Sequence, residues 1–313
     1  MEGTLSLSET PPPWWEARCE ERGLLLHSER WQAVLTAGLG CRPLYAVGDA
    51  GAAVFNLFRK GPFRIAYLAH PVGGLLEGGE PGQLLTSFMA QARPAPHLLR
   101  IPCSAFGDDW TLDWEAAETP ETAICDLQAW SEERLPSGLR RNIRLSARRG
   151  CRVERLSSGH GGLVYALYRA SIGRHGGSLR YPPAYFSALL ELAGRERRLR
   201  CLGAWVGGEL AAFIVVAGHG DTCFYLHGGM LIEHAASQGP TRLFAEAIRW
   251  AREEGHATFN FMSSPPDQPS LVRYKERWGG VTRSHRTHEL ARSRFWKQGL
   301  RVSQALYDRF RSG

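Results

Sequence analysis

The chain contains 313 residues, of which 43% are hydrophobic and 10% aromatic, so it can bury the cores of two domains of ordinary size. Its formal net charge is +7, from 38 Lys and Arg residues against 31 Asp and Glu residues. That excess permits a phosphate-bearing partner but does not require one. No segment reaches the roughly 18 apolar residues of a membrane helix, so we expect no stable membrane insertion. The polar, proline-rich residues 1–13 lack the basic and apolar regions of a signal or transit peptide.

Seven cysteines are spread singly along the chain, at positions 19, 41, 103, 125, 151, 201 and 223. An odd count without a C-x-x-C pair is typical of reduced thiols and predicts neither a disulfide framework nor a zinc site. It favours a cytoplasmic location. His285 and His288 do not suggest a metal site, because strand residues three positions apart point to opposite faces. The chain also lacks the G-x-S-x-G, P-loop and dinucleotide-binding motifs of three large enzyme classes.

In the first half, short apolar runs separated by glycine-rich turns predict strands and one helix. We expect strands at residues 43–47, 52–58 and 63–68, a helix that begins at Pro81, and a strand at residues 97–101. A polar stretch (107–121) and a short strand (123–127) follow.

An arginine-rich helix comes next, with Ser137 as its expected cap and Gly150 at its end. Residues 135–153 contain no acidic side chain but include Arg140, Arg141, Arg144, Arg148, Arg149 and Arg152. Such a face suits an RNA backbone, a diphosphate or an anionic lipid surface. The alternative is a solvated face whose charges are balanced by Glu132, Glu133 or Glu154.

The second half repeats the order of the first. Strands are expected at residues 201–206, 210–217 and 222–227, with Gly207-Gly208 as a hairpin turn between the first two. A helix opens at Pro240 and ends at Gly255, and a strand follows at 257–262. A short helix (269–278), an edge strand (281–290) and an amphipathic helix (295–310) complete the chain.

Short similar sequence segments in the two halves support a duplication. Tyr67-Leu68-Ala69-His70 with the following Gly73-Gly74 matches Tyr225-Leu226-His227 with Gly228-Gly229, and a Pro-Gly or Gly-Pro pair then precedes each helix. The predicted fold class is therefore α/β (α+β), with two tandem modules of mixed central sheets and flanking helices. The expected boundaries are 14–130 for the first module, 131–291 for the second, which carries the active site, and 292–313 for a C-terminal helix.

The start of the helix at Pro240 is a candidate anion site, because unpaired N–H groups at a helix start attract phosphate. The residues that form this start are Ser237, Gln238, Gly239 and Thr241. At this point the second half resembles the GNAT acyltransferase fold. The doubled unit, the arginine helix and the segments Phe259-Asn260-Phe261 and Tyr274-Lys275-Glu276-Arg277-Trp278-Gly279-Gly280 resemble the Fem-type transferases, over about residues 30–290.

The resemblance implies an acyl or aminoacyl transferase that forms an amide by aminolysis of an activated ester. It implies aminoacyl-tRNA or acyl-CoA as co-substrate, with no permanently bound cofactor. It also implies an amine acceptor on a cell-wall precursor, a peptide or a small metabolite, and it allows tRNA as a partner. Lys275 matches the lysine that lies near the reacting carbonyl in Fem-type enzymes, where an ammonium offsets oxyanion charge. A surface lysine in an amphipathic turn is the other interpretation.

The remaining site residues follow the same pattern. Tyr274 and His227 join Lys275 as catalytic candidates, and Leu226 joins the donor-binding set through the backbone of its strand. The acceptor-binding candidates are Arg180, Tyr181, Asn260 and Arg144. Residues 174–181 form an Arg- and Tyr-bearing loop suited to an acceptor, or a plain connection between helices.

Two departures from the families keep alternatives open. Residues 234–239 do not match in register the (Gln/Arg)-x-x-Gly-x-(Gly/Ala) loop of CoA-dependent enzymes, and there is no room for the long helical hairpin of cell-wall Fem enzymes. The alternatives are an acyl-CoA-dependent N-acyltransferase and a non-catalytic, basic adaptor that binds RNA or a membrane surface.

Overall fold

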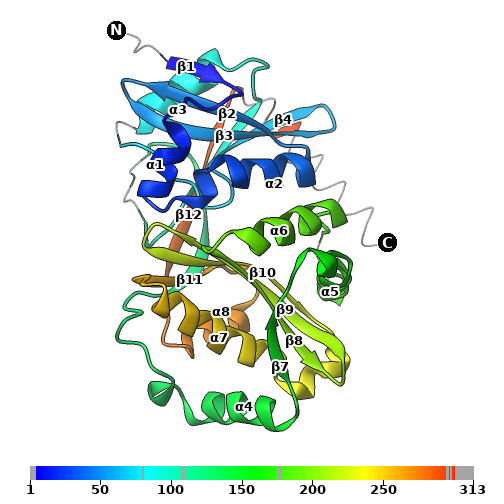
Figure 1. Ribbon diagram of the computed structural model, residues 1–313. Coiled ribbons are helices and arrows are strands. Elements are labelled where there is room, and N and C mark those ends of the chain that lie inside the picture. Colours follow the sequence, from blue (N-terminus) through cyan, green and yellow to red (C-terminus); the bar gives the residue numbers. More distant parts are fainter. Residues whose placement is uncertain are drawn as a thin grey trace. The chain divides into compact units, whose positions relative to one another are not determined.

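The computed structural model describes residues 5–78, 81–107, 110, 112–174, 178–293, 296 and 298–299. The chain divides into two compact units, Met1–Thr119 with Ser284–Gly313, and Pro120–Arg283. Each unit is described by itself below (Figure 1). The amphipathic helix expected at residues 295–310 lies, apart from Trp296, Gln298 and Gly299, outside the described residues.

The first unit contains a sheet of antiparallel strands with one parallel pair. Its elements are β1 (Leu5–Ser8), α1 (Trp15–Glu21), η1 (Leu25–His27), α2 (Glu29–Leu39), β2 (Arg42–Gly48), β3 (Gly51–Lys60), β4 (Phe63–Leu68), α3 (Pro81–Gln91) and β5 (Leu98–Cys103). β1–β2, β2–β3 and β3–β4 are antiparallel, and β4–β5 are parallel. β12 (Val281–Ala291) pairs antiparallel with β5 through Arg286–Ala291.

Adjacent residues of β3 show how this sheet is covered on both faces. Phe55 stacks on Phe88 of α3 with ring centroids 3.6 Å apart. The next residue, Asn56, points to the other face, as strand geometry requires, and donates to Gln32 of α2 at 2.5 Å. The two helices therefore lie on opposite faces of the strand.

The second unit repeats this topology. Its elements are η2 (Glu132–Arg134), α4 (Ser137–Arg148), β7 (Arg152–Arg155), η3 (Ser158–His160), α5 (Gly161–Arg174), α6 (Pro183–Arg195), β8 (Leu199–Val206), β9 (Glu209–His219), β10 (Thr222–Met230), η4 (Ile232–Ser237), α7 (Gly239–Glu253), β11 (Thr258–Ser263) and α8 (Pro269–Glu276). β7–β8, β8–β9 and β9–β10 are antiparallel, and β10–β11 are parallel. β6 (Ala116–Ile124) pairs antiparallel with β11. The repeated sequence segments predicted two units of like topology, and the strand pairings confirm this prediction.

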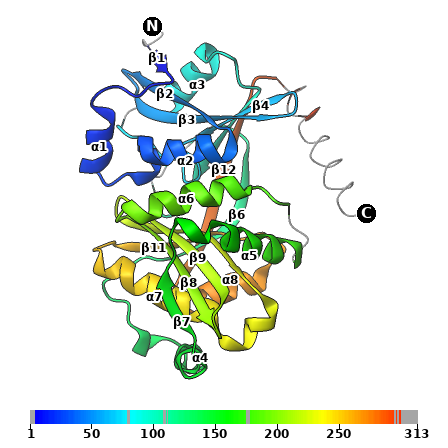
Figure 2. The same ribbon diagram turned by 45° about the vertical axis from the view of Figure 1, so that its right-hand side comes forward.

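The sheet of the second unit separates two helical layers (Figures 1 and 2). On one face, Leu243 and Ile248 of α7 pack with Ala212 and Ile214 of β9 in the main core of the unit. Phe213 lies between Ala212 and Ile214 in β9 and points to the other face. There its ring packs edge-on against that of Phe186 of α6, with ring centroids 6.2 Å apart. A ligand that lies at the edge of β10 can therefore meet groups from α7 on one side and from α6 on the other.

Three local expectations are wrong. Ser137 is the first residue of α4 and not its cap; the N-cap is Pro136, and no side chain caps the helix. The short strand expected at 123–127 is β6, which begins at Ala116 inside the stretch read as polar, because sheet pairing overrides its weak strand propensity. β12 is not an edge strand: β5 pairs with it, and the N–H of Glu289 also donates to the carbonyl of Glu115 at 2.9 Å.

All seven cysteines fall among the described residues, and each is a free thiol. In the described part of the chain, no three or more His, Cys, Asp and Glu side chains gather as metal ligands do. No described helix has both the length and the apolar character needed to cross a membrane.

Candidate active site

A bulge and a strand separation meet on β10. β10 pairs with β11 only from Thr222 to Phe224, and both strands run on beyond that point without a shared register. On the opposite edge, the register between β10 and β9 slips between Tyr225 and His227, so Leu226 has no partner across the ladder. The paired residues Cys223 and Phe224 are buried, whereas every residue from Tyr225 to Met230 is half-buried. The two strands therefore separate beyond Phe224, and the word cleft is used below for this separation of β10 from β11.

The bulge sends neighbouring side chains to opposite faces of the sheet. The ring of Tyr225 lies 4.9 Å from that of Phe244 on α7. His227 faces the other layer, where its Nε2 is 2.8 Å from the Tyr185 hydroxyl of α6. A Cβ atom on Gly228 would collide with the Tyr225 hydroxyl, so only glycine lets that ring lie along the strand. The end of β10 thus presents one phenol and one imidazole on its two sides.

The four donor-binding candidates at the start of α7 form one preorganised turn. Gln238 takes the left-handed conformation (φ 59°) that ends η4 and begins α7. The hydroxyl of Ser237 donates to the carbonyl of His234 at 2.6 Å and accepts from the N–H of Gly239 at 3.2 Å. Thr241 donates to the Gln238 side chain at 3.4 Å. The positive end of α7 is therefore held in a fixed geometry beside the cleft.

Tyr274 of α8 lies at the same helix start. Its ring is 6.1 Å from Phe244 and 6.4 Å from Trp278. Burial raises the pKa of the Tyr274 hydroxyl, and interactions with the side chains of Thr241 and Trp278 partly offset that rise. The phenol therefore keeps its proton at neutral pH, the state in which it can act as an acid.

Lys275, the neighbour of Tyr274, is buried with 3% of its surface exposed, so the interpretation as a surface lysine is wrong. Its Nζ donates to the carbonyl of Met262 at 2.9 Å, to that of Ser263 at 3.3 Å and to the hydroxyl of Ser264 at 2.7 Å. An ammonium has three N–H donors, and these acceptors match them. The geometry therefore favours a role for Lys275 in holding the end of β11 over direct contact with an oxyanion.

Asn260 is fully buried in the same network. Its side-chain amide donates to Glu121 of β6 at 2.9 Å, and its oxygen accepts the N–H of Met262 at 2.7 Å. Glu121, 1% exposed, is absent from the sequence-derived site. The network joins β6, β11 and α8 at the point where the cleft opens.

This network predicts a pH effect. Burial lowers the pKa of Lys275 from 10.5 to about 8, and the charge of Glu121 opposes the shift. Activity should fall as pH rises through about 8, because Lys275 then loses a proton and one N–H donor. Glu121→Gln removes the charge that raises this pKa, so its falling limb should move to lower pH. The measurement is kcat/KM of both proteins from about pH 6 to about pH 10.

A limb that stays in place or moves to higher pH would contradict this assignment. Stability gives a separate check, since the folded protein binds fewer protons than the unfolded chain between about pH 8 and 10.5. The contribution of Lys275 to the free energy of unfolding should therefore rise with pH across that window.

The acceptor-binding candidates are only partly brought together. The ring of Tyr181 lies 4.6 Å from that of His227 and 4.6 Å from that of Tyr185, on the α6 side of β10. Arg180 precedes it, with its N–H bonded to the Tyr168 hydroxyl at 3.0 Å and its side chain exposed. Arg144 lies apart from this group on α4, which packs against α7 on the other face of the sheet.

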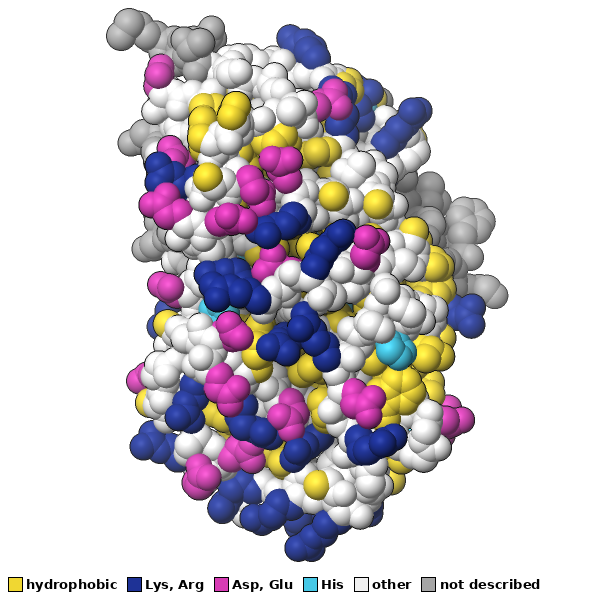
Figure 3. Space-filling view, viewed as in Figure 1, with side chains coloured by type: hydrophobic (Ala, Val, Ile, Leu, Met, Phe, Trp, Pro, Cys, Tyr) yellow, Lys and Arg dark blue, Asp and Glu magenta, His cyan; other side chains and the backbone are white. Residues whose placement is uncertain are grey.

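The exposed face of α4 is strongly basic. Arg141, Arg144 and Arg148 are exposed and form no ion pair with a described residue, whereas Arg140 is half-buried. Dark blue side chains gather over α4 at the lower end of Figure 3. Glu132, one of the acids that could have balanced them, pairs with Arg249 of α7 at 2.8 Å.

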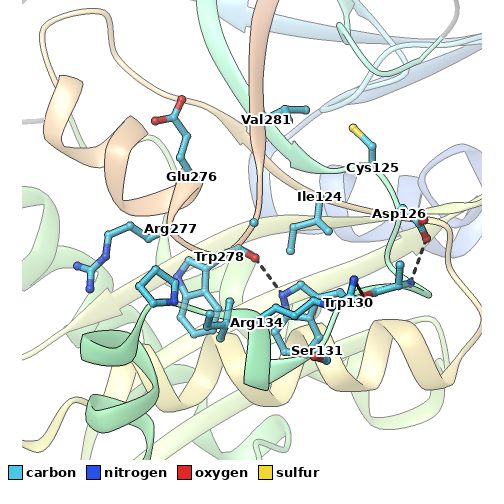
Figure 4. A pocket seen from close by; sticks show the side chains of 14 residues that line it. Ile124, Cys125, Asp126, Trp130, Ser131, Arg134, Glu276, Arg277, Trp278 and Val281 are labelled. Atoms are coloured by element: carbon cyan, nitrogen blue, oxygen red, sulfur yellow. Dashed lines mark hydrogen bonds between the residues drawn. The ribbon is translucent and has the colours of Figure 1, made fainter.

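A separate cavity of about 470 Å³ lies at the C-terminal end of α8 (Figure 4). Ile124, Leu135 and Val281 give it apolar walls, and the Trp130 indole bridges it by donating to the Trp278 carbonyl at 2.9 Å. None of the sequence-derived site residues lines this cavity. It is therefore distinct from the cleft between β10 and β11.

Comparison with known proteins defines the class first. Residues 135–276, inside the second unit, match the family described as Acetyltransferase (GNAT) domain. Residues 135–276 therefore form a GNAT acyltransferase domain, and the fold of the chain is similar to those of FemX and of a tandem GNAT protein. No curated protein sequence matches the chain.

Solved structures support the second part of that statement. FemX superposes with a TM-score of 0.63 and 13% identity, over 90% of this chain and 96% of that one. L-PGS from Bacillus licheniformis gives a TM-score of 0.61 and 17% identity, over 96% of both chains. A tandem GNAT protein from the clavulanic acid biosynthesis pathway gives a TM-score of 0.53 and 11% identity, over 92% of this chain and 98% of that one. At identities this low, these superpositions show a shared fold alone.

Proposed function

We propose that the protein transfers an acyl or aminoacyl group from an activated ester to an amine, in the cleft between β10 and β11. The observation that carries this proposal is the bulge at Leu226 beside the opened strands. A carbonyl that enters the cleft meets the backbone N–H group of Leu226, the residue that the β9–β10 register leaves out. Such fixed donors stabilise the negative charge that develops on the oxygen during attack.

The donor binds through the start of α7. The positive end of that helix, at Gly239 and Thr241, receives a phosphate group of the donor, which brings the acyl carbonyl to the bulge. Aminoacyl-tRNA and acyl-CoA both carry phosphates at a distance from an activated carbonyl. Aminoacyl-tRNA, or a similar ester, is our first choice of donor, and acyl-CoA is the second.

The reaction needs few groups. The acceptor ammonium gives a proton to His227, and the neutral amine attacks the carbonyl carbon held at the bulge. The C–N bond of the amide forms and the bond between the carbonyl carbon and the oxygen or sulfur of the donor breaks. Tyr274 gives its proton to that leaving atom, the new amide nitrogen loses its second proton to solvent, and Tyr274 regains a proton from solvent. The acceptor approaches from the α6 side, past Tyr181 and Arg180, and is an amine of a cell-wall precursor, a peptide or a small metabolite.

The first unit lacks the features that we assign to the active site, so we propose one active site, in the second unit. β4 ends at Leu68, without the bulge that extends β10. The next residues are tied to the unit itself: the N–H of His70 donates to Asn56 at 2.7 Å, and its carbonyl accepts from Trp31 at 2.9 Å. The place that would receive a carbonyl is therefore occupied by the unit's own hydrogen bonds.

Turnover with two donor probes tests the proposal. Acetyl-CoA and a mixture of aminoacyl-tRNAs are each incubated with the protein and a panel of amines, and amide products are identified by mass spectrometry. Mass spectrometry of nucleotides that copurify with the protein separates CoA from RNA. An amide formed from either donor supports the proposal. No amide from either donor, with tight and salt-dependent RNA binding, supports the non-catalytic adaptor instead.

The adaptor is favoured by one observation, the unpaired basic face of α4. Replacing Arg141, Arg144 and Arg148 with Gln should leave the melting temperature nearly unchanged, since exposed charges each contribute on the order of 0–1 kcal/mol. It should weaken binding of a phosphate-bearing donor and reduce the salt dependence of that binding. The measurement is KM or Kd for the donor at several salt concentrations.

The matched control replaces Arg59, Lys60 and Arg197 with Gln, three exposed cations outside α4. Both triple variants change the net charge equally. If they weaken binding equally, or if neither does, the face of α4 is merely solvated.

A further inference from the structure

Met262 has an unusual backbone conformation for its residue type. Its φ is 60°, in the left-handed region that side chains with a Cβ atom disfavour. Both of its backbone polar groups are held by side chains. Its N–H donates to Asn260 at 2.7 Å, and its carbonyl accepts from Lys275 at 2.9 Å.

The position of Met262 coincides with the opening of the cleft. The last pair between β11 and β10 joins Asn260 to Phe224, two residues before Met262. The register between β11 and β6 also becomes irregular between Asn260 and Ser263. The left-handed residue is therefore where β11 departs from its regular path along the sheet.

The groups that hold Met262 are polar and buried. Glu121, Asn260 and Lys275 are 1%, 0% and 3% exposed, and they come from β6, β11 and α8. Burying such groups costs stability that apolar side chains of similar volume would not cost. Packing alone therefore does not account for them, whereas fixing a disfavoured backbone conformation requires donors and acceptors at these places.

We propose that Glu121, Asn260 and Lys275 are positioning residues that hold Met262 in its left-handed conformation and so keep β11 turned away from β10 at the donor cleft. Asn260 accepts a hydrogen bond from the N–H of Met262, and Lys275 donates one to its carbonyl. Glu121 orients the amide of Asn260. The consequence for acyl transfer rests on the proposed function, and the conformation itself does not.

Rescue by glycine is the direct test, because glycine takes positive φ without strain. Asn260→Ala should lower kcat about five- to thirty-fold, which corresponds to the ~1–2 kcal/mol cost of a left-handed non-glycine residue. Adding Met262→Gly should restore most of this loss with little change in KM. Ser263→Gly in the same background is the matched control and should restore nothing, since only residue 262 has positive φ there.

Glu121→Gln, which keeps shape and packing, is the second background if Asn260→Ala folds poorly. It should lose less activity, and Met262→Gly should restore it. An active wild type whose variants are not restored by Met262→Gly, or are restored equally by Ser263→Gly, overturns the inference.

Crystal structures separate this failure from that of the proposed function. If the wild type forms no amide with acetyl-CoA or aminoacyl-tRNA, the proposed function fails and the conformational claim is still tested. The φ of Met262 should become negative in Asn260→Ala, and residue 262 should keep a positive φ in Asn260→Ala with Met262→Gly. A positive φ that persists in Asn260→Ala overturns the inference.

Discussion

We expect Tyr274→Phe to lower kcat by about 10²- to 10⁴-fold, the usual contribution of a positioned proton donor. The phenol lies at the start of α7 beside the cleft, and burial raises its pKa, so it carries the proton that the leaving atom needs. KM should change little, because the proton is required after the donor has bound. The measurement is kcat and KM with the donor and amine that give product in the turnover assay.

Tyr165→Phe is the matched control. Tyr165 is a half-buried tyrosine of α5 in the same unit, with ring contacts to Tyr168 and Phe186. It should keep the activity of the wild type, and both variants should melt near the wild-type temperature. If Tyr274→Phe stays within about twofold of wild-type kcat, the leaving group takes its proton from elsewhere.

The largest loss of stability is expected for Lys275→Met. The substitution keeps the bulk of the side chain but leaves the Ser264 hydroxyl and the Met262 carbonyl without their donor and Glu121 without its nearby opposite charge. Removal of one partner from a buried charged group costs on the order of 3–5 kcal/mol. Denaturant unfolding should show this loss, and kcat should fall with it because the end of β11 is released.

A double-mutant cycle identifies the source of the loss. Glu121→Gln in the Lys275→Met background removes the uncompensated charge, so it should recover part of the stability. Lys60→Met is the control, because Lys60 is exposed on the first unit. This variant should unfold at the wild-type midpoint. Equal stabilities for Lys275→Met and the wild type would mean that the ammonium has no buried role.

Much of the fold could be predicted from the glycine and proline residues that mark the ends of helices and strands. Gly207 and Gly208 have φ of 60° and 89° and form the hairpin expected of a glycine pair, and Gly255, with φ of 85°, follows α7 as expected. Pro183 is the first residue of α6. These signals are local, because each residue type restricts its own backbone, so a single sequence is enough to place them.

The network around Lys275 could not be predicted in the same way. Glu121 and Asn260 are 139 positions apart, and no local pattern reports that they meet. Glu121 lies in a stretch of polar residues that forms a strand by pairing with β11 and β12. The chemical identity of Lys275 likewise gives no sign that it is buried, since lysine is usually exposed. Long-range pairing decided both points.

The most direct test of the account is a crystal structure with unreactive donor analogues. A 3′-aminoacylamino-3′-deoxyadenosine and an acetyl-CoA analogue whose sulfur is replaced by a methylene group cover the two proposed donors. The account predicts that an analogue lies between β10 and β11, with its carbonyl oxygen about 2.7–3.1 Å from the backbone nitrogen of Leu226. An analogue bound at the end of β4 in the first unit, or a cleft that stays empty at saturating concentration of both, would contradict it.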